Sequence, residues 1–285
     1  MDLKAEYLRI TKEYWEKYNQ HLDSVESLKA EYALKRDGYN AEINMINSEC
    51  VTMRDEINQL YEFLISVGGA LNQKITIFDF SKELYLPESS IKVTPKYEKP
   101  QYEDGDAWFD AGLKTIFRNK RNREMIESYE QAVQNEYLKF TKEINKKKSE
   151  KKFAQEAEGI AEIYRDTVII VRDAIREKIL PELELIKAFL YADAIREAAI
   201  DGDGFDHIKP NSIEEYRGTN HHVHYQFVKN TFDFYTLISD FFTKAILTNL
   251  INKRNVSSED KKEFDHIVKN INDSVASLDA KRVLK

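Results

Sequence analysis

The strongest candidates for chemistry are histidines and aspartates that cluster in the carboxy-terminal third. Three histidines fall within four residues, at His221, His222 and His224. Imidazole and carboxylate groups are ligands of zinc, manganese and iron sites. However, the spacing matches no HExxH motif, and the aspartates lack the twelfth-position glutamate of a calcium loop. We favour a solvated loop with helix-capping residues here, and the alternative is a metal site. The predicted metal ligands are His222, His224, His207 and Asp206.

Motifs for other reactions are missing from the sequence. There is no GxxxxGK[ST] loop, no GxGxxG after a strand, no GxSxG elbow and no CxxC pair. These motifs hold phosphates, dinucleotides, nucleophilic serines and redox thiols. The sequence therefore favours a non-enzymatic protein with no cofactor and no catalytic residue. A metal-dependent enzyme, with a divalent metal at the histidines, is kept as an alternative.

A heptad pattern from Leu8 to Val67 indicates the element with the clearest structure. Its second half is apolar at every seam position, which is typical of a helix packed on a partner helix. Asp37-Gly38 is the one turn signal inside it. Because the heptads keep their phase across this turn signal, we expect one helix and not a hairpin. The predicted interaction seam is Ile43, Ile46, Cys50, Met53, Ile57, Leu60, Leu64 and Val67.

The rest of the chain divides into three further segments. Paired glycines end the first helix, and the stretches 74–80 and 90–95 have the residue types of a two-stranded element. A return helix is expected over 122–180, with a solvated lysine cluster at 146–152 and a break or kink at Pro181. The predicted domains are 1–67, a long coiled-coil helix; 68–121, a tip insert; 122–180, the return helix; and 181–285, a helical bundle. The predicted fold is mainly α: long antiparallel coiled-coil helices with a small β-containing tip insert and a C-terminal helical bundle.

The predicted tip has features of a segment that binds a membrane. Its apolar, glycine-containing stretch, residues 63–71, lies between two long helices, and in this outline alone it resembles the head of helical pore-forming toxins of the cytolysin type. The resemblance implies a membrane-active protein. Yet the apolar stretches are shorter than the roughly 20 residues of a spanning helix. The predicted tip residues are Gly68, Gly69, Leu71, Trp108 and Phe109.

Composition narrows the class of partner. With 42% hydrophobic and 33% charged residues, the chain has the balance of a folded, soluble protein, and its net charge of -7 argues against nucleic acid. The one cysteine and a polar first stretch that lacks a secretory signal predict a cytoplasmic protein. We therefore expect a coiled-coil interaction or scaffold protein within a multi-protein assembly, acting through protein partners, with a homo-oligomer as a further option.

Overall fold

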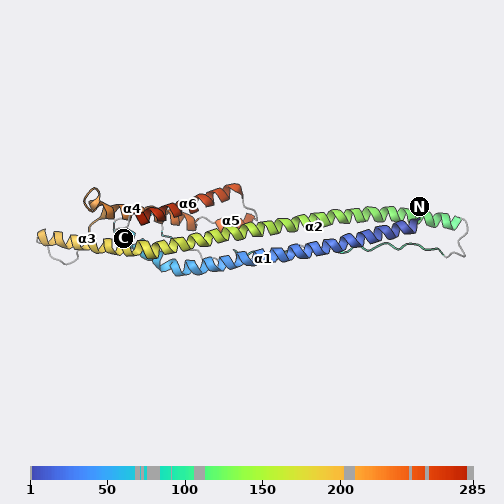
Figure 1. Ribbon diagram of the computed structural model, residues 1–285, viewed down its shortest axis with the longest axis horizontal. Coiled ribbons are helices and arrows are strands. Elements are labelled where there is room, and N and C mark those ends of the chain that lie inside the picture. Colours follow the sequence, from blue (N-terminus) through green and yellow to red (C-terminus); the bar gives the residue numbers. More distant parts are fainter. Residues whose placement is uncertain are drawn as a thin grey trace. The chain divides into compact units, whose positions relative to one another are not determined.

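The computed structural model describes residues 2–67, 71, 74–75, 84–90, 92–105, 113–201, 209–243, 246–253 and 257–280. The chain is mainly helical over these ranges, as predicted, and contains no strand within them. Figure 1 shows the elements in order. The helices are α1 (Leu3–Ser66), α2 (Leu113–Asp173), η2 (Ala174–Ile179), α3 (Leu180–Asp201), η3 (Ile213–Tyr216), α4 (His222–Thr243), α5 (Ile246–Lys253) and α6 (Ser258–Ala280).

The predicted two-stranded element is not seen in the part of the chain that the structure describes. Lys74, Ile75 and residues 92–95 have no regular secondary structure, while 76–80 and Ile91 lie outside the described residues. By contrast, α1 is one helix of 64 residues that passes through Asp37-Gly38. The heptad phase therefore predicted this helix correctly, because a turn would have been free to reset it.

The chain folds as two compact units, which we treat separately. Unit 1 comprises residues 1–37 and 87–155, and unit 2 comprises 38–86 and 156–285. The predicted segments were drawn at expected helix ends, whereas the units divide within both α1 and α2. Each unit thus contains a part of α1 and a part of α2.

The pairing of α1 with α2 is parallel, and the predicted antiparallel direction is wrong. In unit 1, Tyr7 lies near Tyr129 and Tyr14 near Phe140, at ring-centroid distances of 5.9 and 6.3 Å. Residue numbers therefore rise together along both helices, and both helices begin at the same end of this unit (Figure 1). Unit 2 shows the same direction in three ion pairs that α1 makes, two with α2 and one with η2, which directly continues α2. These pairs are Glu42 with Arg165, Glu49 with Arg172, and Glu56 with Arg176.

The connection between the two helices is long enough for a parallel pair. At 1.5 Å per residue, α1 is about 96 Å long. Residues 67–112 can reach roughly 150 Å when extended, at about 3.3 Å per residue. A short connection would have forced an antiparallel hairpin, but this one can return along the whole helix. The predicted antiparallel topology assumed instead a compact insert between the helices.

The heptad register holds in the second half of α1, whereas in the first half one of its two seam positions is displaced by one residue. Leu8 and Trp15 are exposed, whereas the preceding residues Tyr7 and Tyr14 are buried. Apolar residues occupy both positions in these heptads, so the pattern alone could not select between them. The second seam position keeps the predicted register in the first half, because Thr11, Val25, Tyr32 and Tyr39 are buried, and both positions follow it from Ile43 onward.

In unit 2 the predicted bundle forms around large aromatic side chains. Tyr164 of α2 stacks on Phe241 of α4 and lies near Phe264 of α6, at ring-centroid distances of 4.4 and 6.4 Å. The α6 helix begins at Ser258, where Ser257 Oγ accepts the Asp260 N–H at 3.0 Å and caps the first turn. Its apolar face is buried at Phe264, Ile267, Ile271, Val275 and Leu278.

Pro181 does not end the helix that contains it. One π-helical turn, η2, precedes it, and the Leu180 N–H bonds to the Ile175 carbonyl five residues back. A proline removes one backbone donor and its ring collides with the carbonyl four residues earlier in a regular α-helix. A wider turn relieves that collision, so the helix continues as α3.

Candidate functional site

The predicted metal ligands are not brought together among the described residues. Two of the four candidates, Asp206 and His207, lie outside those residues. His222 Nδ1 accepts the Gly218 N–H at 3.1 Å, and its Nε2 lies 3.0 Å from Gln226 Nε2. Both ring nitrogens of His222 thus have protein partners. No group of three potential metal ligands occurs in the described ranges.

His224 belongs instead to an aromatic cluster on α3, η3 and α4. Its ring centroid lies 4.9 Å from that of Phe189 and 6.0 Å from that of His221. Burial lowers the pKa of His224, the neighbouring His221 lowers it further, and Glu182 raises it. The neutral imidazole is therefore favoured at neutral pH. Beside it, burial and Asp193 raise the pKa of Tyr216 to about 12, and the Tyr216 hydroxyl donates to Asp193 at 2.6 Å.

The predicted seam is covered by the chain itself. All eight of its residues are at most 2% exposed, and they lie in unit 2. The thiol of Cys50 shares this environment, and burial raises its pKa to about 12. Of the predicted tip residues, Leu71 is half-buried, whereas Gly68, Gly69, Trp108 and Phe109 lie outside the described residues.

A feature that the sequence did not reveal lies in unit 1. Residues 87–90 and 92–105, which we call the strap, follow α1 in the opposite direction. Pro87 is bonded to Tyr32 and Pro100 to Tyr7. Thirteen strap residues therefore cover about 38 Å of α1, or roughly 2.9 Å each, which is close to the 3.1 Å of polyproline II. The strap is thus extended without belonging to a sheet.

Side chains of both helices bind the strap by its backbone. The hydroxyls of Tyr32 and Tyr7 donate to the carbonyls of Pro87 and Pro100, each at 2.7 Å. Tyr14 Oη accepts the Tyr97 N–H at 2.8 Å. Asn122 bonds both the N–H and the carbonyl of Glu103, at 3.3 and 3.1 Å. These bonds satisfy backbone groups that a strand would satisfy with a neighbouring strand.

Charged side chains are buried beneath the strap. Glu143 Oε2 accepts the backbone N–H and the hydroxyl of Thr94, at 3.0 and 2.8 Å, and lies 3.2 Å from His21 Nε2. Lys147, which we expected on a solvated face, is 1% exposed and donates to Ser89 Oγ at 2.6 Å. Burial lowers the pKa of the Lys147 ammonium. These groups fix the strap to the helices, because a buried charge is tolerated only with partners.

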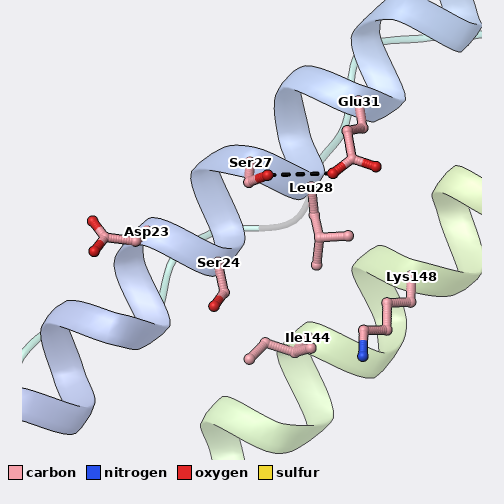
Figure 2. A pocket seen from close by; sticks show the side chains of 7 residues that line it. All are labelled: Asp23, Ser24, Ser27, Leu28, Glu31, Ile144 and Lys148. Atoms are coloured by element: carbon pink, nitrogen blue, oxygen red, sulfur yellow. Dashed lines mark hydrogen bonds between the residues drawn. The ribbon is translucent and has the colours of Figure 1, made fainter.

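An open groove of about 530 Å³ lies between α1 and α2 in unit 1. Figure 2 shows its polar wall on α1, where Ser27 Oγ donates to Glu31 at 3.2 Å, and Lys148 on α2 opposite. Leu28 and Ile144 add apolar surface. Glu31 is also ion-paired with Lys151, and the hydrogen bond from Lys151 lowers the pKa of this carboxyl. The charge of Glu31 in this groove is thus balanced by Lys151.

The outward face of α3 is apolar and uncovered. Leu185 and Ile195 are each 46% exposed, Ala188 and Ala192 lie exposed between them, and Ala199 lies exposed four residues after Ile195. The spacing of three and four residues is that of a helix–helix seam. The opposite face of α3 is buried through Leu183, Ile186, Leu190 and Ala194. We call residues 185, 188, 192, 195 and 199 the α3 stripe.

Comparison with protein-family models, curated proteins and solved structures finds no match to this chain. Within the described residues, no helix combines the length and the apolar character needed to cross a membrane. The assignment of function therefore depends on the surfaces described above.

Proposed function

We propose that this chain is a non-enzymatic interaction protein, a scaffold component of a multi-protein assembly. The observation that carries the proposal is the α3 stripe. Five small or apolar residues at heptad spacing are exposed on a helix whose other face is already packed. Exposed apolar surface at such spacing is the surface that a second helix covers.

The shape of the stripe suits a helical partner. Alanines at three of the five positions allow a close approach of a second backbone, while Leu185 and Ile195 supply apolar side chains at two points. In this proposal the paired helices α1 and α2 form a coiled coil that supports α3, and the protein acts in the cytoplasm. The partner helix belongs to another protein or to a second copy of this chain.

Capture of partners by the full chain tests the proposal. Purified protein is cross-linked in a cell extract through Lys187, an exposed lysine of α3, and the cross-linked peptides are identified by mass spectrometry. We expect a stoichiometric partner cross-linked to α3. Leu185→Glu with Ile195→Glu should lose that partner, because two charges would then have to be buried in the seam.

The matched control is Ile163→Glu, which places the same charge at a residue of unit 2 that is 40% exposed but lies on α2. It should retain the partner. Light scattering separates the two kinds of partner, since a second copy would double the mass. The proposal is contradicted if the chain stays monomeric and gives no α3 cross-link. It is also contradicted if Leu185→Glu with Ile195→Glu captures as much partner as the unaltered chain.

A further inference from the structure

The first turns of α2, in unit 1, carry a concentration of positive charge with no acidic residue among them. Residues 113–123 contain five lysines and arginines and no acidic residue, although the whole chain has a net charge of -7. Screening limits exposed charges to a range of about 8 Å at physiological salt. This local charge, and not the net charge of the chain, therefore decides what can approach this surface.

Two large apolar side chains are exposed in the middle of these charges. Ile116 is 63% exposed and Phe117 is 59% exposed. On the other side of the helix, Asn122 is buried and binds the strap, which fixes the inward face. At about 100° per residue, Ile116 and Phe117 each lie within about 60° of the direction opposite Asn122. They therefore point away from the body of unit 1.

Basic side chains flank this apolar pair. Lys120 falls between Ile116 and Phe117 around the helix, and Arg123 and Arg121 fall on the two sides. Some of these charges are partly balanced: Arg121 pairs with Glu103 at 2.9 Å, and Lys120 lies 3.9 Å from Glu124. Arg123 is exposed. The outward face is thus apolar at its centre and basic at its edges.

We propose that this face, formed by Ile116, Phe117, Lys120, Arg121 and Arg123, docks on the surface of an anionic phospholipid membrane. A helix with an apolar centre and basic edges inserts its apolar side chains at the headgroup boundary, while its cations contact anionic lipids. Nucleic acid is the other polyanion to consider. Single-stranded bases bind by stacking on aromatic rings. Ile116 cannot stack on a base, whereas it can enter a lipid layer, so the lipid surface fits both exposed apolar residues.

Co-sedimentation of the full chain with vesicles tests the proposal. We expect binding to vesicles of phosphatidylcholine mixed with phosphatidylserine, little binding to phosphatidylcholine alone, and release by salt. Lys120→Gln with Arg123→Gln should weaken binding about 25-fold, at roughly fivefold for each charge near the surface. Ile116→Ser with Phe117→Ser should also abolish or strongly weaken it.

Matched variants on the same helix control for general effects. Leu138→Ser removes an apolar residue that is 61% exposed, and Lys142→Gln removes an exposed charge, both further along α2. Neither should change vesicle binding, and circular dichroism confirms that each variant is folded. The proposal is overturned by absence of binding to anionic vesicles, by equal binding to neutral vesicles, or by equal losses in the control variants. Binding of a single-stranded RNA oligonucleotide without vesicle binding also overturns it.

Discussion

Tyr7, Tyr14 and Tyr32 show how single residues serve two packing partners at once. Each ring is buried between the helices of unit 1, and each hydroxyl bonds the backbone of the strap. A leucine at these positions would bury similar apolar area but would leave the strap backbone without its bonding partner. Tyrosine is favoured where one end of a side chain is apolar and the other meets a polar group.

His224 provides a test at the residue scale. Burial lowers its pKa in the folded state, so the unfolded chain, with an ordinary histidine pKa near 6.5, binds the proton more readily. The free energy of unfolding should therefore fall as the pH drops below about 6.5. His224→Gln should make this fall less steep, as measured by urea unfolding at several pH values.

His266 is the control for this pH dependence. It is an exposed residue of α6, so His266→Gln makes the same substitution outside the buried aromatic cluster. If His224→Gln gives the same slope as the unaltered chain, His224 is not the group whose protonation opposes folding.

At the scale of elements, the direction of the α1–α2 pair has an electrostatic signature. Glu42, Glu49 and Glu56 recur every seven residues on α1, and two arginines of α2 and one of η2 meet them in the same order. Heptads of apolar residues predict that a helix packs, but they are alike in both directions. Charges along the edges of the seam can distinguish the directions, and here they match a parallel pair.

Reversal of one charge pair tests the parallel direction. Glu42 and Arg165 are largely buried, with Arg165 Nη1 2.7 Å from Glu42 Oε2. Glu42→Arg and Arg165→Glu should each lower the free energy of unfolding by about 2 kcal/mol, since each places like charges together away from water. The double reversal should recover part of that loss in a double-mutant cycle.

The exposed pair Arg9 and Glu13 is a control for this cycle, because a solvated pair of this spacing contributes only about 0.3–0.5 kcal/mol. A coupling energy near zero between Glu42 and Arg165 would argue against the parallel pairing.

The strap is an element held mainly by side chains, and Glu143 is central to it. Glu143→Ala removes the acceptor of both Thr94 bonds and the partner of His21, so we expect a loss of about 2–3 kcal/mol. Hydrogen exchange of residues 92–105 should become faster. Glu130→Ala, at an exposed position of α2 in the same unit, should change the free energy of unfolding by less than about 0.5 kcal/mol. Unchanged exchange in the strap of the Glu143 variant would contradict its role.

How far the sequence could predict these elements depends on whether each one has a period. The seam from Ile43 to Val67 repeats every seven residues, and its burial could be predicted directly from that repeat. The strap has none, because an extended segment bonded by side chains shows neither the alternation of a sheet nor the spacing of a helix. Lys147 was assigned to solvent because lysine clusters usually lie there, and nothing local to it indicates that Ser89, 58 residues away, would accept its bond. Likewise, the exposure of the α3 stripe depends on which face of α3 the bundle covers.

At the scale of the whole molecule, the division into two units implies that stability is divided as well. Unit 1 depends on buried polar groups such as Glu143 and Lys147, whereas unit 2 has a larger apolar and aromatic core. Regions with different kinds of contact open with different free energies. We therefore expect thermal unfolding to depart from a single two-state transition, with a calorimetric enthalpy that exceeds the van't Hoff enthalpy.

Variants confined to one unit test this division. Gly159→Ala in unit 2 should raise stability by about 0.5–1 kcal/mol, because a helical glycine costs that much and an added Cβ meets no described atom within 4 Å. Gly38→Ala, also in unit 2, should gain less, since its Cβ would collide with Glu158 Oε1 and that side chain must move. Glu143→Ala should lower only the transition of unit 1, and Gly159→Ala should raise only the transition of unit 2. If both variants shift one common transition in calorimetry, the two units unfold together. In that case α1 and α2, which belong to both units, transmit the loss of packing from one unit to the other.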